Sequence, residues 1–572
     1  MGERDRKKTI GIGYQDFELV RTEEIFYIDK TDFIRQWWET KDQVTLITRP
    51  RRFGKTLNMS TLEKFFSTDY AGRGDLFQGL SIWEDEKFRE LQGTYPVIFL
   101  SFADIKERSF SQAREGICRI IRRLYKKFDF LLESDLLSNA EKNEFRNVSV
   151  HMGDNEAAFS LRALSDYLSR FHRKKAIVLL DEYDTPMQAA YVNGYWDDLA
   201  EFTRNLFSTT FKTNPYLKRA LMTGVTRVSR ESIFSGLNNL EVVTTTSDKY
   251  ADCFGFTEEE VFAALEEQGL SDRKDEVKAW YDGFTFGNKT DIYNPWSITH
   301  YLDKKEAEDY WANSSSNDLA DKLIREGGEE VKRDFESLLC GGSIVTVIDE
   351  QIVYDRLDVS DEAVWSLLLA SGYLKVVQKE PLHERENDLD GPRYELALTN
   401  KEVRRMFRSM VRDWFRNGGA KYNDFIKALL CDDLEAMNEY MNDVALVTFS
   451  SFDTGKKASK SEPERFYHGF VLGLMVELSG RYALTSNRES GFGRYDVMLE
   501  PLKPEDDAII MEFKVFQPKK EKDLEETTAA ALAQIEERKY AATLEAKGVL
   551  TEKIRKYGFA FQGREVLIAG GR

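Results

Sequence analysis

The chain has 572 residues, 42% of them hydrophobic and 31% charged, which is enough for about three or four domains that each bury a core. It contains no run of 18 apolar residues and no CxxC pair, which argues against a membrane span, a disulfide framework and a zinc site, and favours a reducing cytoplasm. The net charge of −18 repels a phosphate backbone on average, so nucleic acid would have to bind a local basic surface.

The first part of the chain alternates apolar runs typical of strands with amphipathic runs typical of helices, which predicts an α/β domain with a parallel sheet. Several strand candidates are almost continuously apolar, as strands covered on both faces are. The predicted strands are 43–48, 95–102, 175–181, 218–224 and 240–246, and the predicted helices are 54–67, 109–131, 157–171 and 195–212. We assign residues 1–256 to this domain.

The segment TLITRPRRFGKT places a short loop between the first predicted strand and the first of these helices. Such a loop directs backbone N–H groups and a helix N-terminus at an anion, while Lys55 reaches the terminal phosphates and the Thr56 hydroxyl meets Mg²⁺. Arg49 stands where the general Walker A pattern has its first glycine, so the entry turn cannot use a glycine conformation, and Pro50 is expected to stiffen it. The predicted nucleotide-binding residues of the loop are Arg49, Pro50, Arg51, Arg52, Phe53, Gly54, Lys55 and Thr56.

A second motif, AIVLLDEYD, is an apolar strand that ends in Asp181 and Glu182, 126 residues after Lys55 (181 − 55). We expect Asp181 to hold Mg²⁺, and Glu182 to orient and activate the attacking water. Taken alone, Asp181 and Glu182 could also be polar residues that cap the end of a strand and have no catalytic role. Both motifs in strand contexts predict an enzyme that binds and hydrolyses ATP with Mg²⁺.

The third polar strand end lies in KRALMTGVTRVSR, where Thr223 is the predicted γ-phosphate sensor. Arg227 or Arg230 is expected to stabilise charge in the transition state, from the same subunit or from a neighbouring one. The sequence leaves these two arginines as alternatives. An arginine supplied by a neighbouring subunit would require a homo-oligomer.

From about residue 257 the pattern changes, since Thr257 followed by acidic residues predicts a helix start, and helices continue to about 340. We assign 257–340 to a helical lid region and 341–453 to a middle helical region with a winged-helix-like module over 341–400. The basic stretch 401–416 is expected to be a solvated helix face. The polar stretch 454–464 is the predicted linker.

Residues 454–572 are assigned to a last domain, whose final hundred residues run helix, strand, strand, helix. Along the strand AIIMEFKV, Glu512 and Lys514 share one face, and Asp496 on the preceding strand RYDVMLE is placed to meet Glu512. Two carboxylates and a lysine suit Mg²⁺-dependent hydrolysis of a phosphodiester, because the carboxylates hold the metal and the lysine orients the water or stabilises the pentavalent phosphate. Glu464 and Glu489 are further candidate metal ligands. An ordinary ion pair on a solvated sheet face is the alternative for Glu512 and Lys514.

The segments IGIGYQDFELVRTEEIFYIDKTDFI, TRPRRFGKT, LLDEYDTP and MTGVTRVSRESIFSGLNNL closely resemble the bacterial AAA-ATPase-like family that often carries a C-terminal PD-(D/E)XK nuclease. WYDGFTFGNKTDIYNPWSI and SGYLKVV are similar to later signatures of this family, so the resemblance covers most of the chain in order. It implies a P-loop NTPase domain and a C-terminal α/β restriction-endonuclease-like domain. In AALAQIEERKY, Gln534 and Tyr540 match the Q…Y helix of related nucleases.

We therefore predict a P-loop protein that hydrolyses ATP and is coupled to a Mg²⁺-dependent nuclease for DNA, with RNA the less favoured substrate. By analogy, such a pairing suits defence or mobile-element processing. The alternative is an ATPase switch whose nuclease-like domain only binds nucleic acid or a protein partner, and the acidic net charge suits a protein partner. No membrane association is predicted.

Overall fold

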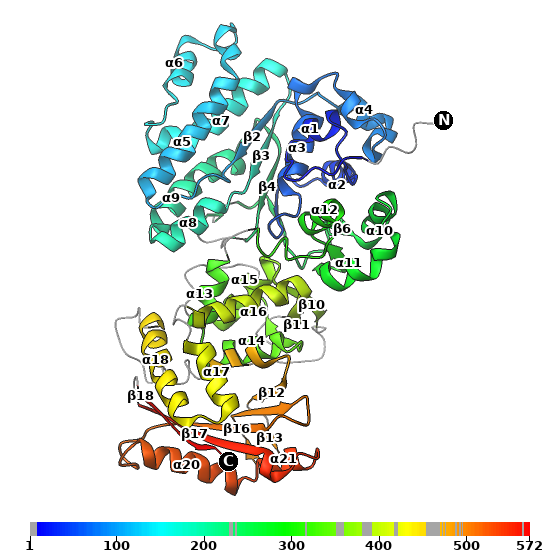
Figure 1. The fold of residues 1–572 in the computed structure, drawn as a ribbon. Helices are drawn as coiled ribbons and strands as arrows, with labels where there is room; N and C mark the ends of the chain where they lie inside the picture. Colours follow the sequence, from blue (N-terminus) through cyan, green and yellow to red (C-terminus); the bar gives the residue numbers. More distant parts are fainter. Residues whose placement is uncertain are drawn as a thin grey trace, which may run out of the picture. The chain divides into compact units, whose positions relative to one another are not determined.

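The computed structural model of the chain describes residues 8–227, 233–234, 237–314, 317–349, 360–379, 392–416, 421–452, 470–471, 473–474, 476–486, 489–490, 493–494, 496–562 and 565–571 (Figure 1). The chain divides into two compact units, residues 1–316 with 343–403, and residues 317–342 with 404–572. Among the described residues, every helix is too short or too polar to cross a membrane.

A five-stranded parallel sheet forms the centre of the first unit, in the order β2-β3-β4-β1-β5. The three central strands β1, β3 and β4 are almost entirely buried, which explains the nearly continuous apolar runs of the sequence. The predicted parallel-sheet domain is confirmed. Because β4 lies between β1 and β3, the carboxyl ends of these three strands meet at one edge. The strands are β1 (Val44–Thr48), β2 (Val97–Ser101), β3 (Ala176–Asp181), β4 (Leu217–Gly224) and β5 (Leu240–Val243).

Helices cover both faces of this sheet (Figure 1). One face carries α1 (Phe17–Thr22), α2 (Asp32–Glu39) and α3 (Lys55–Phe66), and the other carries α5 (Phe110–Lys127), α7 (Asp154–His172) and α9 (Trp196–Phe207). The predicted helix 195–212 ends as an α-helix at Phe207 and continues as a π-helical turn over Ser208–Lys212. Shorter helices are α4 (Glu86–Leu91), α6 (Asn139–Asn147) and α8 (Thr185–Asn193).

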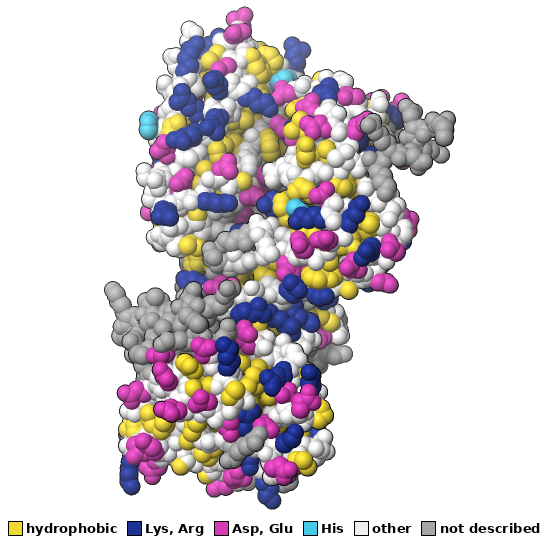
Figure 2. Space-filling model, viewed as in Figure 1, with side chains coloured by type: hydrophobic (Ala, Val, Ile, Leu, Met, Phe, Trp, Pro, Cys, Tyr) yellow, Lys and Arg dark blue, Asp and Glu magenta, His cyan; other side chains and the backbone are white. Residues whose placement is uncertain are grey.

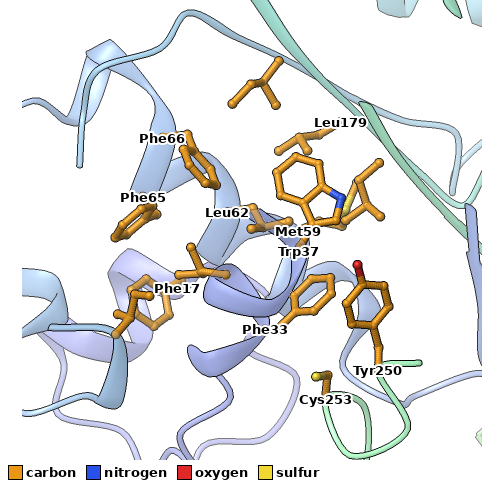
Figure 3. Packing of buried hydrophobic residues seen from close by; sticks show 14 of the residues in the cluster. Phe17, Phe33, Trp37, Met59, Leu62, Phe65, Phe66, Leu179, Tyr250 and Cys253 are labelled. Atoms are coloured by element: carbon orange, nitrogen blue, oxygen red, sulfur yellow. The ribbon is translucent and has the colours of Figure 1, made fainter. Parts of the chain in front are cut away.

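An aromatic core fixes α3 against the sheet (Figure 3). Met59 and Leu62 of α3 belong to one cluster with Trp37 of α2 and Leu179 of β3, and the rings of Phe65 and Phe66 follow along the same helix. Nearly every residue of α3 from Asn58 to Phe66 is buried, so this helix lies within the core and not on the surface. Its N-terminus is therefore held in a fixed place at the carboxyl edge of the sheet.

Two small antiparallel sheets complete the first unit, in the orders β6-β8-β7 and β10-β11-β9. The helix predicted to start after Thr257 is present, and Thr257 forms a capping box with Glu260. The elements are β6 (Phe256–Thr257), α10 (Glu258–Glu267), α11 (Lys274–Tyr281), β7 (Asp282–Phe286), β8 (Lys289–Tyr293), α12 (Pro295–Lys304), β9 (Ile344–Val347), α15 (Asp361–Ala370), β10 (Leu374–Lys379) and β11 (Arg393–Leu398). The predicted lid and winged-helix-like regions divide the chain differently from the two compact units, and their boundaries stay predictions.

The second unit contains a five-stranded mixed sheet in the order β12-β15-β16-β17-β18, in which β16 and β17 are parallel and the other pairs antiparallel. The two predicted strands are β15 (Val497–Pro501) and β16 (Ala508–Val515). The sequence prediction omitted β12 (Tyr482–Ser486), β17 (Ile554–Gln562) and β18 (Glu565–Gly571), because charged residues and Gly558 interrupt the apolar alternation of β17.

Helices α13 (Asp318–Glu326), α14 (Glu329–Leu339), α17 (Lys421–Cys431), α18 (Leu434–Phe452), α20 (Leu524–Glu537) and α21 (Ala541–Glu545) accompany this sheet, together with the short strands β13 (Glu489–Ser490) and β14 (Gly493–Arg494). The basic helix α16 (Lys401–Arg416) buries Val403, Met406 and Phe407, whereas Arg405 and Arg412 are exposed, as expected for a solvated helix face. Figure 2 shows Lys and Arg side chains gathered where Figure 1 draws this helix. The predicted linker 454–464 lies outside the described residues.

Two asparagines of α18 cover the edge strand β18. The Asn438 side chain accepts a hydrogen bond from the N–H of Ile568 (2.7 Å) and donates to its carbonyl oxygen (2.9 Å), and Asn442 does the same with Val566 (2.8 and 2.7 Å). Their spacing of four residues along α18 matches two residues along β18. The open backbone groups of this edge are thus satisfied by side chains, which protects the strand from pairing with another chain.

Glu402 is a buried carboxylate in the first turn of α16. It accepts hydrogen bonds from the backbone N–H groups of Trp311 (2.5 Å) and Ala312 (3.2 Å) and from the Ser297 hydroxyl (3.0 Å). The indole N–H of Trp311 in turn donates to the carbonyl oxygen of Arg51 (2.9 Å). Burial raises the pKa of Glu402 to about 7, although these three hydrogen bonds act in the opposite direction.

We expect Glu402→Gln to flatten the pH dependence of stability. The folded protein holds the Glu402 proton more tightly than the unfolded chain, whose pKa is near 4.5, so this stabilisation is complete below that pH and is lost as the pH rises through about 7. Thermal unfolding measured at intervals over this range should show a steeper decline of the midpoint for the wild type than for Glu402→Gln. Glu306→Gln, at an exposed site, should follow the wild type, and parallel curves for all three proteins would contradict the prediction.

Candidate functional site

The loop between β1 and α3 forms the first candidate site. Gly54 has a φ of +76°, a left-handed conformation that favours glycine, and α3 begins at the next residue, Lys55. The Lys55 ammonium donates hydrogen bonds to the carbonyl oxygens of Arg49 (3.1 Å) and Pro50 (2.9 Å), so it lies inside the curve of the loop. Burial lowers the pKa of Lys55, and the charges of Glu182, Asp181 and Asp184 oppose that shift.

Asp181 joins the ends of three neighbouring elements. One carboxylate oxygen accepts a hydrogen bond from the Thr56 hydroxyl of α3 (2.7 Å), and the other accepts one from the Thr223 hydroxyl of β4 (2.5 Å). Asp181 is fully buried, and burial raises its pKa against the effect of these two bonds. A carboxylate beside a threonine hydroxyl is a donor set of oxygens that suits Mg²⁺, so the residues fit the metal of a bound nucleotide.

Glu182 follows Asp181 in a backbone conformation that is rare for residues other than glycine, with a φ of +51°. Its carboxylate accepts a hydrogen bond from the Thr185 hydroxyl (3.1 Å) at the start of α8. Non-glycine residues in this region are concentrated at functional sites, where the surrounding structure imposes the conformation. Arg227 is half-buried three residues after the end of β4, and Arg230 lies outside the described residues.

The structure turns the Arg49 side chain away from the loop that Lys55 enters. The guanidinium is completely buried and lies 4.6 Å from the centre of the Phe286 ring. It donates hydrogen bonds to the carbonyl oxygens of Thr48 (2.9 Å), Thr244 (2.6 Å), Lys249 (3.4 Å) and Tyr250 (3.3 Å). Arg49 therefore fastens the segment after β5 to the entry of the loop, and only its backbone remains for a nucleotide. That Arg49 is one of the nucleotide-binding residues of the loop stays a prediction, and its backbone would have to make the contact.

Among the other loop residues, Phe53 packs into the protein interior, whereas Arg51 and Arg52 are exposed. Phe53 is buried between the rings of Phe284 (4.8 Å) and Phe286 (5.3 Å), which makes it an anchor. Arg51 and Arg52 are exposed; Arg52 stacks over the Trp296 ring at 4.1 Å, and Arg51 donates a hydrogen bond to the Gln188 side chain (3.3 Å). The structure thus brings Lys55, Thr56, Asp181 and Thr223 together and directs the Phe53 side chain elsewhere.

The second candidate site lies on the mixed sheet of the other unit. Glu512 of β16 is 3% exposed, and one of its carboxylate oxygens accepts a hydrogen bond from the Gln534 amide of α20. The carbonyl oxygen of that amide accepts a hydrogen bond from the Lys514 ammonium (2.8 Å). The Gln534 amide also donates to the Tyr540 hydroxyl (3.3 Å), and Asp496 accepts a hydrogen bond from the backbone N–H of Phe513 (2.8 Å).

The electrostatics of this site favour a bound cation. Burial raises the pKa of Glu512 to about 8, with a further rise from the charge of Asp496 and an opposing effect of Lys514. Within the part of the chain that the structure describes, the second carboxylate oxygen of Glu512 is buried without a hydrogen-bond partner. A metal ion would satisfy this oxygen and offset the repulsion between the two carboxylates, so the residues fit Mg²⁺. A solvated Glu512–Lys514 ion pair does not describe this geometry, since Glu512 is buried and Gln534 lies between the two groups.

Two of the predicted metal ligands are not placed by the structure. Glu464 lies outside the described residues, and for Glu489 only the backbone is described, as part of β13. Asp184 is not among the predicted site residues, although it belongs to the LLDEYDTP segment that was singled out. It is 1% exposed and contacts the end of β4; the signal in the sequence was a third acidic residue directly after an apolar strand.

Comparisons with known proteins match the two sites to two family models. Residues 11–234 match the model described as predicted AAA-ATPase, and residues 462–570 match that of the PD-(D/E)XK nuclease superfamily. A relative in Azotobacter chroococcum mcd 1, described as an uncharacterized protein in the vnfD 5' region, is 28% identical over 405 residues, which cover 70% of this chain and 69% of that protein.

We expect Arg49→Lys to destabilise the first unit. Lysine keeps the positive charge but lacks the planar fork that serves several carbonyl oxygens at once, so some of these buried oxygens lose their donor. The midpoint of the first thermal transition should fall by about 5 °C. Arg51→Lys, an exposed position in the same loop, should shift it by less than about 1 °C, and equal midpoints for the two variants would show that the Arg49 contacts are dispensable.

Proposed function

Because the chain joins an AAA-ATPase-like domain to a domain of the PD-(D/E)XK nuclease superfamily, we propose that it hydrolyses ATP and cleaves DNA, with RNA as the less favoured substrate. We further propose that both reactions use Mg²⁺ and that the state of the nucleotide controls the nuclease. The acidic net charge of −18 means that nucleic acid has to be met locally, by basic groups such as Lys514.

The single observation that carries the ATPase proposal is the Asp181 carboxylate between the Thr56 and Thr223 hydroxyls, beside Lys55. In the proposed reaction the loop and the N-terminus of α3 bind the phosphates, and the Lys55 ammonium leaves its two loop carbonyls for the terminal phosphate. Thr56 and Asp181 would hold Mg²⁺, which when bound would neutralise phosphate charge. Glu182 accepts the proton of the attacking water, and Thr223 contacts the phosphate that is released.

Neighbouring groups prepare Asp181 and Glu182 for these tasks. The two threonine hydroxyls orient the Asp181 carboxylate, and burial excludes water that would compete for it. The backbone of Glu182 has a left-handed conformation, and its carboxylate accepts a hydrogen bond from the Thr185 hydroxyl. Arg227 is the proposed source of positive charge for the transition state, and it acts in the same subunit or across a homo-oligomer interface.

The nuclease proposal depends on the buried oxygen of Glu512, beside Asp496 and Lys514, that no described residue binds. Asp496 and Glu512 are the proposed Mg²⁺ ligands, and the metal supplies an activated water and stabilises phosphate charge. The Gln534 amide holds Glu512 and Lys514 in a fixed relation, because its two ends bind the two groups. Lys514 orients the water or stabilises the pentavalent phosphate.

The ATPase proposal predicts different losses for two variants. Lys55→Ala removes the charge that binds the terminal phosphate, so both ATP binding and hydrolysis should fall by at least about ten-fold. Glu182→Gln keeps the shape of the site without a base, so ATP should still bind while hydrolysis falls by about 100-fold or more. Phosphate release and binding of a fluorescent ATP analogue measure the two steps. Lys126→Ala, at an exposed position of α5, should match the wild type. Equal hydrolysis by all four proteins would place the reaction elsewhere.

The nuclease proposal is tested by cleavage of plasmid and linear single-stranded DNA in Mg²⁺ or Mn²⁺, with and without ATP. Glu512→Ala should abolish cleavage while Glu505→Ala, at an exposed site, cleaves like the wild type. A changed dependence on ATP in Lys55→Ala would support control of the nuclease by nucleotide. If the wild type hydrolyses ATP but cuts no substrate under any condition, the alternative of an ATPase switch with a nucleic-acid-binding or protein-binding domain replaces the nuclease.

A further inference from the structure

Asp184 is a buried carboxylate that the proposed ATPase chemistry does not use. It is 1% exposed, and it lies three residues after Asp181, at the position directly before α8. An aspartate at this position usually caps the helix by accepting a backbone N–H of its first turn. Here its side chain makes no capping hydrogen bond with α8. Its place is therefore not explained by the stability of that helix.

The Asp184 carboxylate instead binds the chain directly after β4. One of its oxygens accepts hydrogen bonds from the backbone N–H groups of Val225 (3.0 Å) and Thr226 (2.8 Å), from the Thr226 hydroxyl (2.9 Å) and from the Gln188 amide (3.1 Å). Four donors offset the cost of burying a carboxylate. Three of them belong to two consecutive residues, so the carboxylate fixes the course of the backbone there.

Tyr183 holds the same segment at two further points. Its backbone N–H donates to the carbonyl oxygen of Thr223 (3.0 Å), and its buried hydroxyl donates to the carbonyl oxygen of Thr226 (2.8 Å). The packing is close: a Cβ atom on Gly224 would lie 2.6 Å from an Asp184 carboxylate oxygen and 2.7 Å from the Tyr183 ring. Only glycine permits this approach.

The segment held in this way carries two of the proposed catalytic groups. Thr223 donates its hydroxyl hydrogen bond to Asp181, and Arg227 directly follows Thr226. The same contacts also lead to the nucleotide-binding loop, because Gln188 accepts a hydrogen bond from the Arg51 guanidinium (3.3 Å) while it donates to Asp184. Displacement of Val225 and Thr226 would therefore move the groups that face the terminal phosphate.

We infer that Asp184 is a positioning residue of the ATPase site: it fixes Val225 and Thr226 and thereby sets the orientation of Thr223 toward Asp181 and the placement of Arg227. The inference rests on the proposed ATP hydrolysis. Because the positioned groups act on the phosphate in the transition state, loss of Asp184 lowers turnover more than it weakens ATP binding.

The first test compares Asp184→Ala with Asp184→Asn in steady-state ATP hydrolysis. Asp184→Ala should lower kcat by about 10-fold to 100-fold with KM for ATP within about three-fold of the wild type. Asp184→Asn should recover part of the loss, because its amide oxygen can still accept from Val225 and Thr226. Asp135→Ala is the matched control at an exposed site and should behave like the wild type.

The second test asks whether Asp184 acts through the segment it holds. In double-mutant cycles, Asp184→Ala is combined with Thr223→Val and, separately, with Arg227→Ala. If Asp184 positions either group, the second substitution has little further effect on kcat. The kcat of at least one double variant should then be lower than that of its slower single variant by no more than about two-fold. Losses that multiply in both cycles, or a rise in KM without a fall in kcat, overturn the inference and leave a purely structural role.

Failure of the inference differs from failure of the proposed function. A wild type that hydrolyses no ATP refutes the function, whereas equal kcat for the wild type, Asp184→Ala and Asp135→Ala refutes only the role of Asp184. Circular dichroism and thermal unfolding show whether Asp184→Ala folds. If it does not, Thr226→Val and Gln188→Ala each remove one donor to Asp184; a three-fold to ten-fold lower kcat in either supports the inference, and unchanged kcat in both overturns it.

Discussion

The buried carboxylate of Asp181 is the point at which the parallel sheet and its nucleotide-binding loop are held together. Its two oxygens bind hydroxyl groups from α3 and from β4, so one side chain at the end of β3 connects the three elements that face the nucleotide in the proposed reaction. This is possible because β4 lies between β1 and β3, which brings the carboxyl ends of all three strands to one edge. A carboxylate is costly to bury, and burial raises the pKa of Asp181 even with both hydroxyl bonds in place. A bound cation would offset the free-energy cost of burying this carboxylate, which is why the geometry favours a metal–nucleotide complex.

The same physical arrangement occurs independently in the mixed sheet. Glu512 is buried within β16, has a raised pKa and keeps one oxygen without a hydrogen-bond partner among the described residues, while the neutral Gln534 amide binds its other oxygen. A neutral amide orients the carboxylate without neutralising it, whereas a direct bond from Lys514 would form an ion pair and reduce its affinity for a metal. The bond from Lys514 to the other end of the amide keeps the positive charge close but separate. Both sites thus keep a carboxylate in an environment that a divalent cation would stabilise.

The sequence predicted those features that depend on local pattern. The five parallel strands follow from apolar runs, and the Lys55, Thr56 and Asp181 cluster follows from motifs at the ends of those strands. It did not predict the β12, β17 and β18 strands; charged residues and Gly558 interrupt the alternation of β17, and the parallel partner of β17, β16, lies 46 residues earlier in the chain (554 − 508). The direction of the Arg49 side chain was equally hidden: three of the four carbonyl oxygens that it binds belong to a segment 195 to 201 residues away, which no local pattern contains. The hydrogen bonds that Asp184 accepts from Val225 and Thr226, 41 and 42 residues later, are absent from any local pattern for the same reason, although the acidic residue itself is visible after the apolar strand.

The tertiary contacts of Arg49 explain how arginine can replace the usual first glycine of the loop. Glycine at this position frees the backbone, whereas Arg49 replaces that freedom by anchoring: its own N–H donates to the carbonyl oxygen of Gly224 (3.1 Å), and its guanidinium binds the segment after β5. Residue 49 therefore ties the loop to the two strands that flank β1. Gly224 is the residue between Thr223 and the two residues held by Asp184. The hydrogen bond from Arg49 to the Gly224 carbonyl therefore joins the entry of the loop to the segment that carries the proposed sensor. A shift of the loop upon binding phosphate would thus reach Thr223 through a single peptide unit.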